Sequence, residues 1–215
     1  MGKRNEARRQ AALARKRSKQ KAATKARNRT ASHPQARMAA AVAAAHSPVR
    51  ECLVPESLFE LGIGNIIFSR TLPSGETATA IFLLDVFCLG VKDAFFEILS
   101  PGEYEMTISR IKDRAPLRPA LPSCARKLIE GAVRYAEVFG LRPHQDYRAA
   151  KGIFGDADPT TCSQDFEYGR EGKPFYVSGP NDTPAKSRQI LAMLERVCGP
   201  DGFHFLMASE DGSEI

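Results

Sequence analysis

Three aspartates are the residues best suited to metal-assisted chemistry in this 215-residue chain. Asp85 lies inside the apolar run 81–90, where an ionised carboxylate is costly to bury unless it is paired or metal-bound. Asp93 follows closely and Asp156 lies far along the chain, so only the fold can bring the three together. If it does, they could hold divalent metals for phosphodiester hydrolysis. The alternative is that Asp85 is hydrogen-bonded, or paired with Lys92 or an arginine.

Residues 81–90 also resemble the first strand of RNase H-like nucleases. In that family an aspartate on a central strand precedes a small loop, as Asp85-Val-Phe-Cys-Leu-Gly90 runs here, and clustered Asp and Glu hold two metals. The chain departs from the family pattern because its hairpin precedes the aspartate and no second acidic helix position can be assigned. The segments FLLDVFCLGVKDAFFE, FGDADPTTC and YVSGPNDTPAKSRQIL are similar to an uncharacterised group of bacterial proteins, a resemblance that implies no activity.

Two other segments offer chemistry of a different kind. His144 lies between Arg142 and Asp146, and a His–Asp pair can support acid–base catalysis, although no nucleophile signature accompanies it. The run SGPNDTP (178–184) precedes a predicted helix, and a helix start can bind an anion. The ligands of that anion would be Thr183, Lys186 and Arg188. Ordinary helix capping is the alternative interpretation.

No sequence motif indicates a cofactor. The chain has no Walker A loop and no GxGxxG run, so we expect no nucleotide cofactor. The five cysteines include no CxxC pair, which excludes the common zinc spacings and argues against a disulfide framework. Cys88, Cys124 and Cys198 lie in apolar patterns and are expected to be small buried hydrophobic residues in a reducing cytoplasm.

Charge gives the clearest indication of a partner. Residues 1–50 contain 14 Lys and Arg and one acid, Glu6, whereas residues 51–215 contain 17 Lys and Arg and 24 acids. The formal charge of +6 therefore combines a region of +13 with a region of −7, which predicts a polyanion-binding tail. We expect twelve basic residues to contact a phosphate backbone: Lys3, Arg4, Arg8, Arg9, Arg15, Lys16, Arg17, Lys19, Lys21, Lys25, Arg27 and Arg29.

The basic arm, residues 1–47, is expected to be disordered when free. Its first 30 residues contain no aromatic or β-branched aliphatic side chain, and like charges four residues apart oppose a helix. Docked phosphates would relieve that repulsion, so the arm should become partly helical when bound, and residues 31–47 are expected to be a linker. RNA is favoured over DNA because short basic arms that fold on binding are a frequent RNA-binding device.

A membrane partner is not expected. The longest apolar stretch, 78–91, is too short to span a bilayer and contains Asp85, and the N-terminus lacks the apolar segment of a secretory signal. The arm also lacks the aromatic anchors that usually accompany lipid binding. A solvated, solubilising tail and attraction to anionic lipid remain the alternative interpretations of the arm.

The elements that must position these residues belong to an α+β domain over residues 48–207, followed by an acidic tail, 208–215. We expect antiparallel hairpins packed with helices in one compact domain. Strands are predicted at 65–72, 77–89, 165–168, 174–177 and 203–207, and 165–168 should pair with 174–177 around the turn GREGK. Helices are predicted at 55–61, 100–113, 123–139, 145–154 and 183–199, and either type at 91–99. Ser100 and Glu103 predict a capping box for the second helix, and the last helix should turn Ile190, Leu191, Leu194 and Val197 inward.

The sequence as a whole predicts a nucleic-acid-associated accessory protein, RNA- or ribosome-linked, with a non-catalytic body. The first alternative is a metal-dependent nuclease that uses Asp85 with other carboxylates and uses the arm only to capture substrate. The second is an interaction module whose acidic body binds a basic protein. The sequence does not indicate an oligomeric state.

Overall fold

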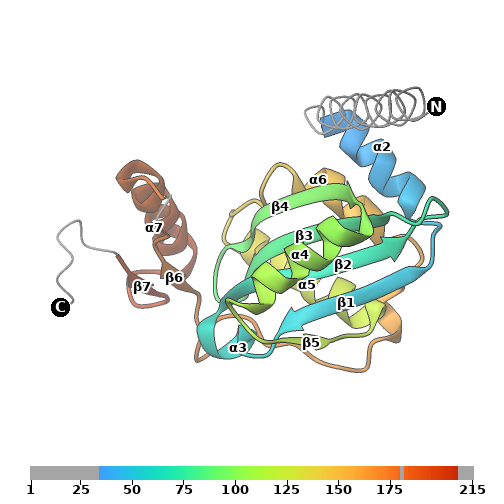
Figure 1. Ribbon diagram of the computed structural model, residues 1–215. Coiled ribbons are helices and arrows are strands. Elements are labelled where there is room, and N and C mark those ends of the chain that lie inside the picture. The colour runs from blue at the N-terminus through green and yellow to red at the C-terminus, as the bar shows by residue number, and fades with distance from the viewer. Residues whose placement is uncertain (1–33, 180–181, 208–215) are drawn as a thin grey trace, which may run out of the picture.

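A five-stranded antiparallel sheet of order β4-β3-β2-β1-β5 is the centre of the molecule (Figure 1). The computed structural model describes residues 34–179 and 182–207. The strands are β1 (Val49–Pro55), β2 (Ile63–Thr71), β3 (Thr77–Asp85), β4 (Gly90–Leu99) and β5 (Leu117–Pro119). The first four form a meander, and β5 returns to pair with the outer edge of β1.

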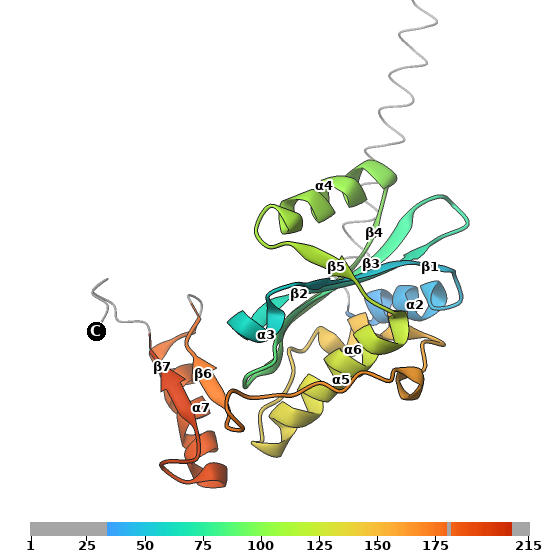
Figure 2. The same ribbon diagram turned by 90° about the horizontal axis from the view of Figure 1, so that it is seen from below.

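Helices cover both faces of this sheet (Figure 2). One face carries α4 (Pro101–Lys112), and the short α3 (Leu58–Leu61) connects β1 to β2. The opposite face carries α2 (Pro34–Ala44), α5 (Pro122–Val138), α6 (Tyr147–Ala150), η1 (Lys151–Phe154) and η2 (Pro159–Thr161). Strand β3 is buried along almost its whole length, as its continuous apolar character predicted.

Each face of the sheet has its own apolar core. Beneath α4, the residues Leu53, Ile67 and Ile81 of three adjacent strands pack against Tyr104 and Ile108. The larger core lies on the opposite face and includes Phe68, Phe82, Ile129, Ala132, Ile153 and Phe154. Successive residues of a strand point to opposite faces of the sheet. Because an apolar core covers each face, the residues on both faces are mostly apolar.

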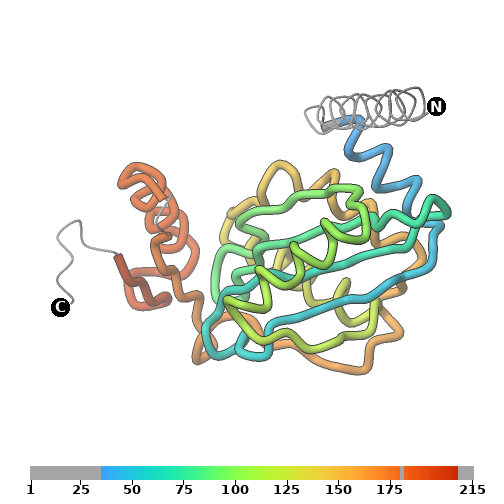
Figure 3. The backbone as a smooth tube through the Cα atoms, viewed as in Figure 1, coloured from blue at the N-terminus to red at the C-terminus, as the bar shows by residue number. Residues whose placement is uncertain are grey.

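The C-terminal residues form a small unit at the end of the sheet, drawn in orange to red in Figure 3. It comprises β6 (Phe175–Val177), α7 (Pro184–Cys198) and β7 (His204–Leu206), and β6 pairs with β7 in parallel. Its core joins Tyr176, Ile190 and Leu194 to Cys88 in the β3–β4 turn and to Phe139 after α5. Of the residues expected to face inward on α7, Val197 is instead exposed.

The predicted α+β class is confirmed, and most helices begin where their caps predicted. Ser100 and Glu103 form the expected capping box of α4, and Thr183 caps α7. The predicted hairpin of 165–168 with 174–177 is wrong: residues 165–168 form no strand, and β6 pairs with β7. The strand predicted to reach residue 89 ends at Asp85, because a turn follows it.

The expectation of a linker over residues 31–47 is wrong for its described part. Residues 34–44 form α2, and Ala41 and Ala44 of this helix are buried in the main core. The folded domain therefore includes α2, which precedes residue 48. The expected disorder of residues 1–33 and the acidic tail 208–215 lie outside the described residues.

A disulfide contradicts the expectation for the cysteines. Cys124, near the start of α5, is bonded to Cys162, which follows η2. Cys88 is buried, as predicted, whereas Cys198 is only partly buried. The widely spaced cysteines concealed this pair because no local motif links positions 38 residues apart.

Candidate functional site

Asp85 closes the turn between β3 and β4. Its Oδ1 accepts hydrogen bonds from the backbone N–H groups of Phe87 and Cys88, at 3.0 and 2.9 Å. Burial raises the pKa of Asp85 to about 6, although the Cys88 N–H and the nearby charge of Lys92 act in the opposite direction. A side chain that binds its own turn in this way has a structural role.

Asp93 and Asp156, the other predicted metal ligands, have partners of their own. Asp93 is exposed, and its Oδ1 lies 3.5 Å from Nδ1 of His144. Asp156 pairs with Arg70 at 3.0 Å. Within residues 34–179 and 182–207, no group of three or more His, Cys, Asp and Glu side chains is placed to hold a metal ion. The three aspartates are thus not assembled into a metal centre in the described part of the chain.

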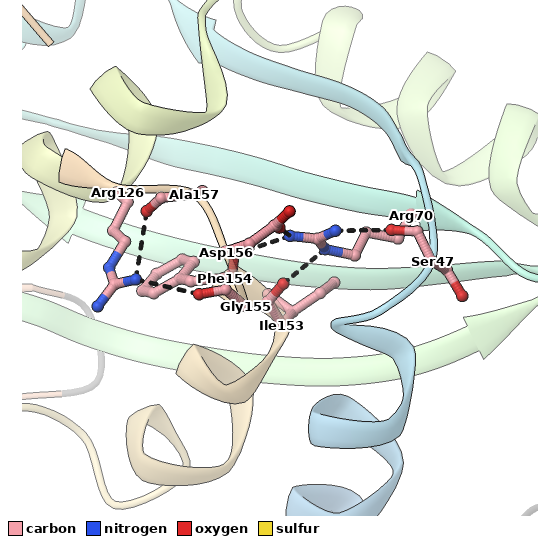
Figure 4. A network of polar contacts seen from close by, with 8 residues as sticks. All are labelled: Ser47, Arg70, Arg126, Ile153, Phe154, Gly155, Asp156 and Ala157. Atoms are coloured by element: carbon pink, nitrogen blue, oxygen red, sulfur yellow. Dashed lines mark hydrogen bonds and ion pairs between the residues drawn. The ribbon is translucent and has the colours of Figure 1, made fainter. Parts of the chain in front are cut away.

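Arg70 anchors the loop that contains Asp156 (Figure 4). Its side chain is only 3% exposed, and it donates to the carbonyl groups of Ser47, Ile153 and Phe154 as well as to Asp156. The bond from Arg70 holds the pKa of the Asp156 carboxyl below its ordinary value. Because a buried guanidinium is tolerated only when its donors are paired, this network ties β2 to η1 and to the end of α2.

One face of α5 fixes the same loop from the other side. Arg126 donates to the carbonyl groups of Gly155 and Ala157, and its guanidinium lies 5.8 Å from the centre of the Phe154 ring (Figure 4). Lys127 donates to the Cys162 carbonyl beside the disulfide. These contacts position η1 and, through it, α6.

The predicted anion site before α7 is occupied by a carboxylate of the chain itself. The Asp182 side chain is 4% exposed, accepts from the Gly179 N–H, and pairs with Lys186 at 2.8 Å and with Lys92 at 3.6 Å. Burial works against ionisation, yet these partners hold the pKa of Asp182 below its ordinary value. Thr183 accepts from the Lys186 N–H as an ordinary cap, and Arg188 is exposed. The arrangement favours capping over an external anion.

The segment around His144 lines a shallow depression of about 420 Å³ between the end of α5 and η1. Its charged or titratable lining residues are Glu137, Arg142, His144, Arg148 and Lys151, and the buried Tyr147 forms part of its wall. The structure therefore brings Arg142 and His144 together with two cations, Arg148 and Lys151, that the sequence analysis did not single out.

The cations of this depression are more available than its acids. Arg142 and Arg148 are exposed and have no ion pair within the described residues, and Lys151 lies 5.5 Å from the centre of the Tyr147 ring. Of two nearby acids outside the lining, Asp146 pairs with Arg37 at 3.3 Å, and Asp93 contacts His144 of the lining. Glu137 is the remaining carboxylate on the lining. Such an arrangement can attract an anion.

A second depression, of about 220 Å³, connects this site to α2. Gln35 and Met38 of α2 line it, and it shares Gln145 and Arg148 with the first. Helix α2 packs beside α6 (Figure 1). Gln35, in the first turn of α2, lines the second depression and so places the start of the helix beside the cationic one.

One sequence pattern could have identified Arg148 and Lys151, the two lining cations that the sequence analysis did not single out. Arg148 and Lys151 are three residues apart in a predicted helix, a spacing that places two side chains on one face. Their relation to Arg142 depends on how the chain turns after α5, which the sequence did not show. Comparison with protein-family models, with curated proteins and with solved structures finds no match to this chain.

Proposed function

We propose that this protein is a nucleic-acid-associated accessory protein that holds RNA through its phosphate backbone. The observation that carries the proposal is the position of Arg142, Arg148 and Lys151 around one depression. That depression shares Gln145 and Arg148 with a second one lined by α2, the helix to which the basic residues 1–33 are joined. Residues 51–215 carry a net negative charge, so the positive charge gathered at this depression is a local exception.

The physical basis of such binding is counterion release. Each Lys or Arg that neutralises a phosphate frees condensed cations, so a protein with about 6–10 such contacts loses roughly 10³–10⁵ in affinity between 50 and 200 mM salt. The twelve cations of residues 1–29 suffice for that number. Residues 1–33 contain no Phe, Tyr or Trp on which a base could stack, so we expect little preference between bases.

RNA remains the favoured polymer, and the ribosome is the abundant source of it. A short arm rich in Arg, Lys and Ala suits the irregular backbone of folded RNA, where ordering of the arm can accompany binding. The metal-nuclease alternative has no such support, because Asp85, Asp93 and Asp156 each have separate partners.

The test compares the full chain with a chain that starts at residue 34, which keeps α2 and its core alanines. Binding to a fluorescein-labelled single-stranded RNA and to DNA of the same sequence is followed by anisotropy at 50–200 mM KCl. We expect the shortened chain to keep its circular dichroism spectrum and to lose at least a hundredfold in RNA affinity. Equal affinities for the two chains would reject the proposal, and tighter binding of DNA would reject the preference for RNA.

A further inference from the structure

We propose that the depression lined by Arg142, Arg148 and Lys151 is a binding site for one phosphodiester group of the bound polynucleotide. This inference rests on the proposed function and extends it, because it adds a defined site on the folded domain to the contacts made by residues 1–33. It also assigns a role to the cations of the segment 142–151.

The charge of the lining fits a phosphate. Three cations face one carboxylate, Glu137, so the lining has an excess of two positive charges before His144 is counted. Of two acids outside the lining, Asp146 pairs with Arg37, and Asp93 lies 3.5 Å from Nδ1 of His144. Arginine forks bind phosphate oxygens in pairs, and Arg142 and Arg148 have no competing ion pair within the described residues.

The backbone beneath these cations is held in place. The His144 N–H donates to the Val91 carbonyl of β4 at 2.9 Å, and its Nδ1 accepts from the Asp146 N–H at 3.4 Å. Tyr147 and Ala150 of α6 are buried in the main core. Arg148 and Lys151 therefore extend from an anchored turn, which lowers the entropy lost when a ligand orders their side chains.

The same geometry predicts that the site does not recognise bases. Tyr147 contributes the aromatic ring of the lining, but it is 7% exposed and Lys151 lies over it. No exposed Phe, Tyr or Trp ring lines the depression within the described residues, so the large aromatic surfaces on which bases usually stack are missing there. The ligand is thus the charged backbone group, whatever base it carries.

The experiment uses the full-length protein and a 12-nucleotide RNA with hydroxyl groups at both ends, so that every phosphate is a diester. The test variant combines Arg142→Gln, Arg148→Gln and Lys151→Gln. The matched control combines Arg110→Gln, Lys112→Gln and Arg114→Gln, which removes three exposed cations at the end of α4, on the opposite face of the sheet (Figure 2). Both variants change the net charge equally.

We expect the test variant to bind at least tenfold more weakly at 100 mM KCl, and its log–log salt slope to decrease in magnitude by about 0.7, as the loss of one neutralised phosphate of a single strand predicts. The control should change affinity less than threefold. In ¹H–¹⁵N spectra of the wild-type protein, addition of the RNA should shift the amide signals of residues 142–152.

Two results would overturn the site. One is an equal loss in both variants, and the other is RNA binding that leaves the signals of residues 142–152 unshifted. In either case the arm can still be responsible for binding, and the proposed function survives if the chain that starts at residue 34 loses affinity. If the full-length protein does not bind the RNA even at 50 mM KCl, the proposed function fails, and this site fails with it.

Discussion

Nη1 of Arg37 donates to Oδ2 of Asp146 at 3.3 Å, across 109 residues of sequence. This contact joins α2 to the turn before α6 and so aligns the attachment point of the basic residues with the cationic depression. It also neutralises the carboxylate of Asp146, which would otherwise oppose an anion bound at Arg148. The contact thus has a mechanical and an electrostatic consequence, and substitution can separate the two.

The first prediction concerns that pair. Arg37→Gln should weaken RNA binding about threefold at 100 mM KCl because it leaves Asp146 unneutralised, while the free energy of unfolding changes by less than about 1 kcal/mol for a partly exposed pair. Adding Asp146→Asn should restore the affinity. Anisotropy titrations and urea denaturation provide the two measurements. If the double variant binds as weakly as Arg37→Gln alone, the electrostatic explanation is incorrect.

The second prediction concerns Arg70. Arg70→Met should lower the free energy of unfolding by about 3–5 kcal/mol, because it removes the charge partner of Asp156 and leaves three carbonyl groups without their donor. Asp156→Asn should leave the urea midpoint nearly unchanged, because the Asp156 side chain is 89% exposed. A large loss in both variants would show that the ion pair, and not the carbonyl contacts, is the source of stability.

Local signals in the sequence predicted local structure well. The capping box of Ser100 and Glu103 and the cap at Thr183 each depend on residues a few positions apart, and the helices begin there. The turn GREGK gave a misleading signal: it forms only an isolated bridge between Arg170 and Lys173, because the strand partner of β6 lies near the C-terminus. Pairing over such a distance is decided by the tertiary core and not by the turn.

Helix α2 and the candidate site escaped prediction for related reasons. The helix contacts the core through small residues such as Ala41 and Ala44, so it shows no stripe of large apolar side chains. The cations Arg142, Arg148 and Lys151 are ordinary surface residues until the turn after α5 and the packing of α2 place them around one depression. Charge is the basis for proposing a polyanionic partner, whereas only the fold brings these three cations around one depression.

The third prediction concerns the disulfide between Cys124 and Cys162. Reduction should lower the free energy of unfolding by about 3–4 kcal/mol, the chain-entropy value for a loop closed over 38 residues. The melting temperature of the wild-type protein, measured with and without dithiothreitol, should fall accordingly. The double variant Cys124→Ser/Cys162→Ser should already melt at the lower temperature and should not respond to the reductant. A wild-type protein whose thiols are shown by mass spectrometry to be reduced, but whose melting is unchanged, would contradict this.

The last prediction concerns the pH dependence that Asp85 imposes. Its pKa in the folded protein is raised from 3.8 to about 6 by burial, so between these values the folded state binds more protons than the unfolded state. The contribution of Asp85 to stability is therefore fully present below pH 4 and is lost as the pH rises through about 6. At pH 7 the ionised side chain destabilises the fold, although its Oδ1 still accepts two backbone hydrogen bonds.

Asp85→Asn keeps an acceptor for the Phe87 and Cys88 N–H groups and removes the charge. We expect the variant to be more stable than the wild type at pH 7 by roughly 1–3 kcal/mol, since one pKa unit corresponds to about 1.4 kcal/mol. Between pH 4 and 6 its stability should vary less with pH, and urea denaturation across that range measures the difference. The same protein, incubated with labelled RNA and Mg²⁺, tests the nuclease alternative independently. A wild-type chain that cleaves the RNA, beside a stable Asp85→Asn variant that does not, would mean that Asp85 serves catalysis and not only the turn.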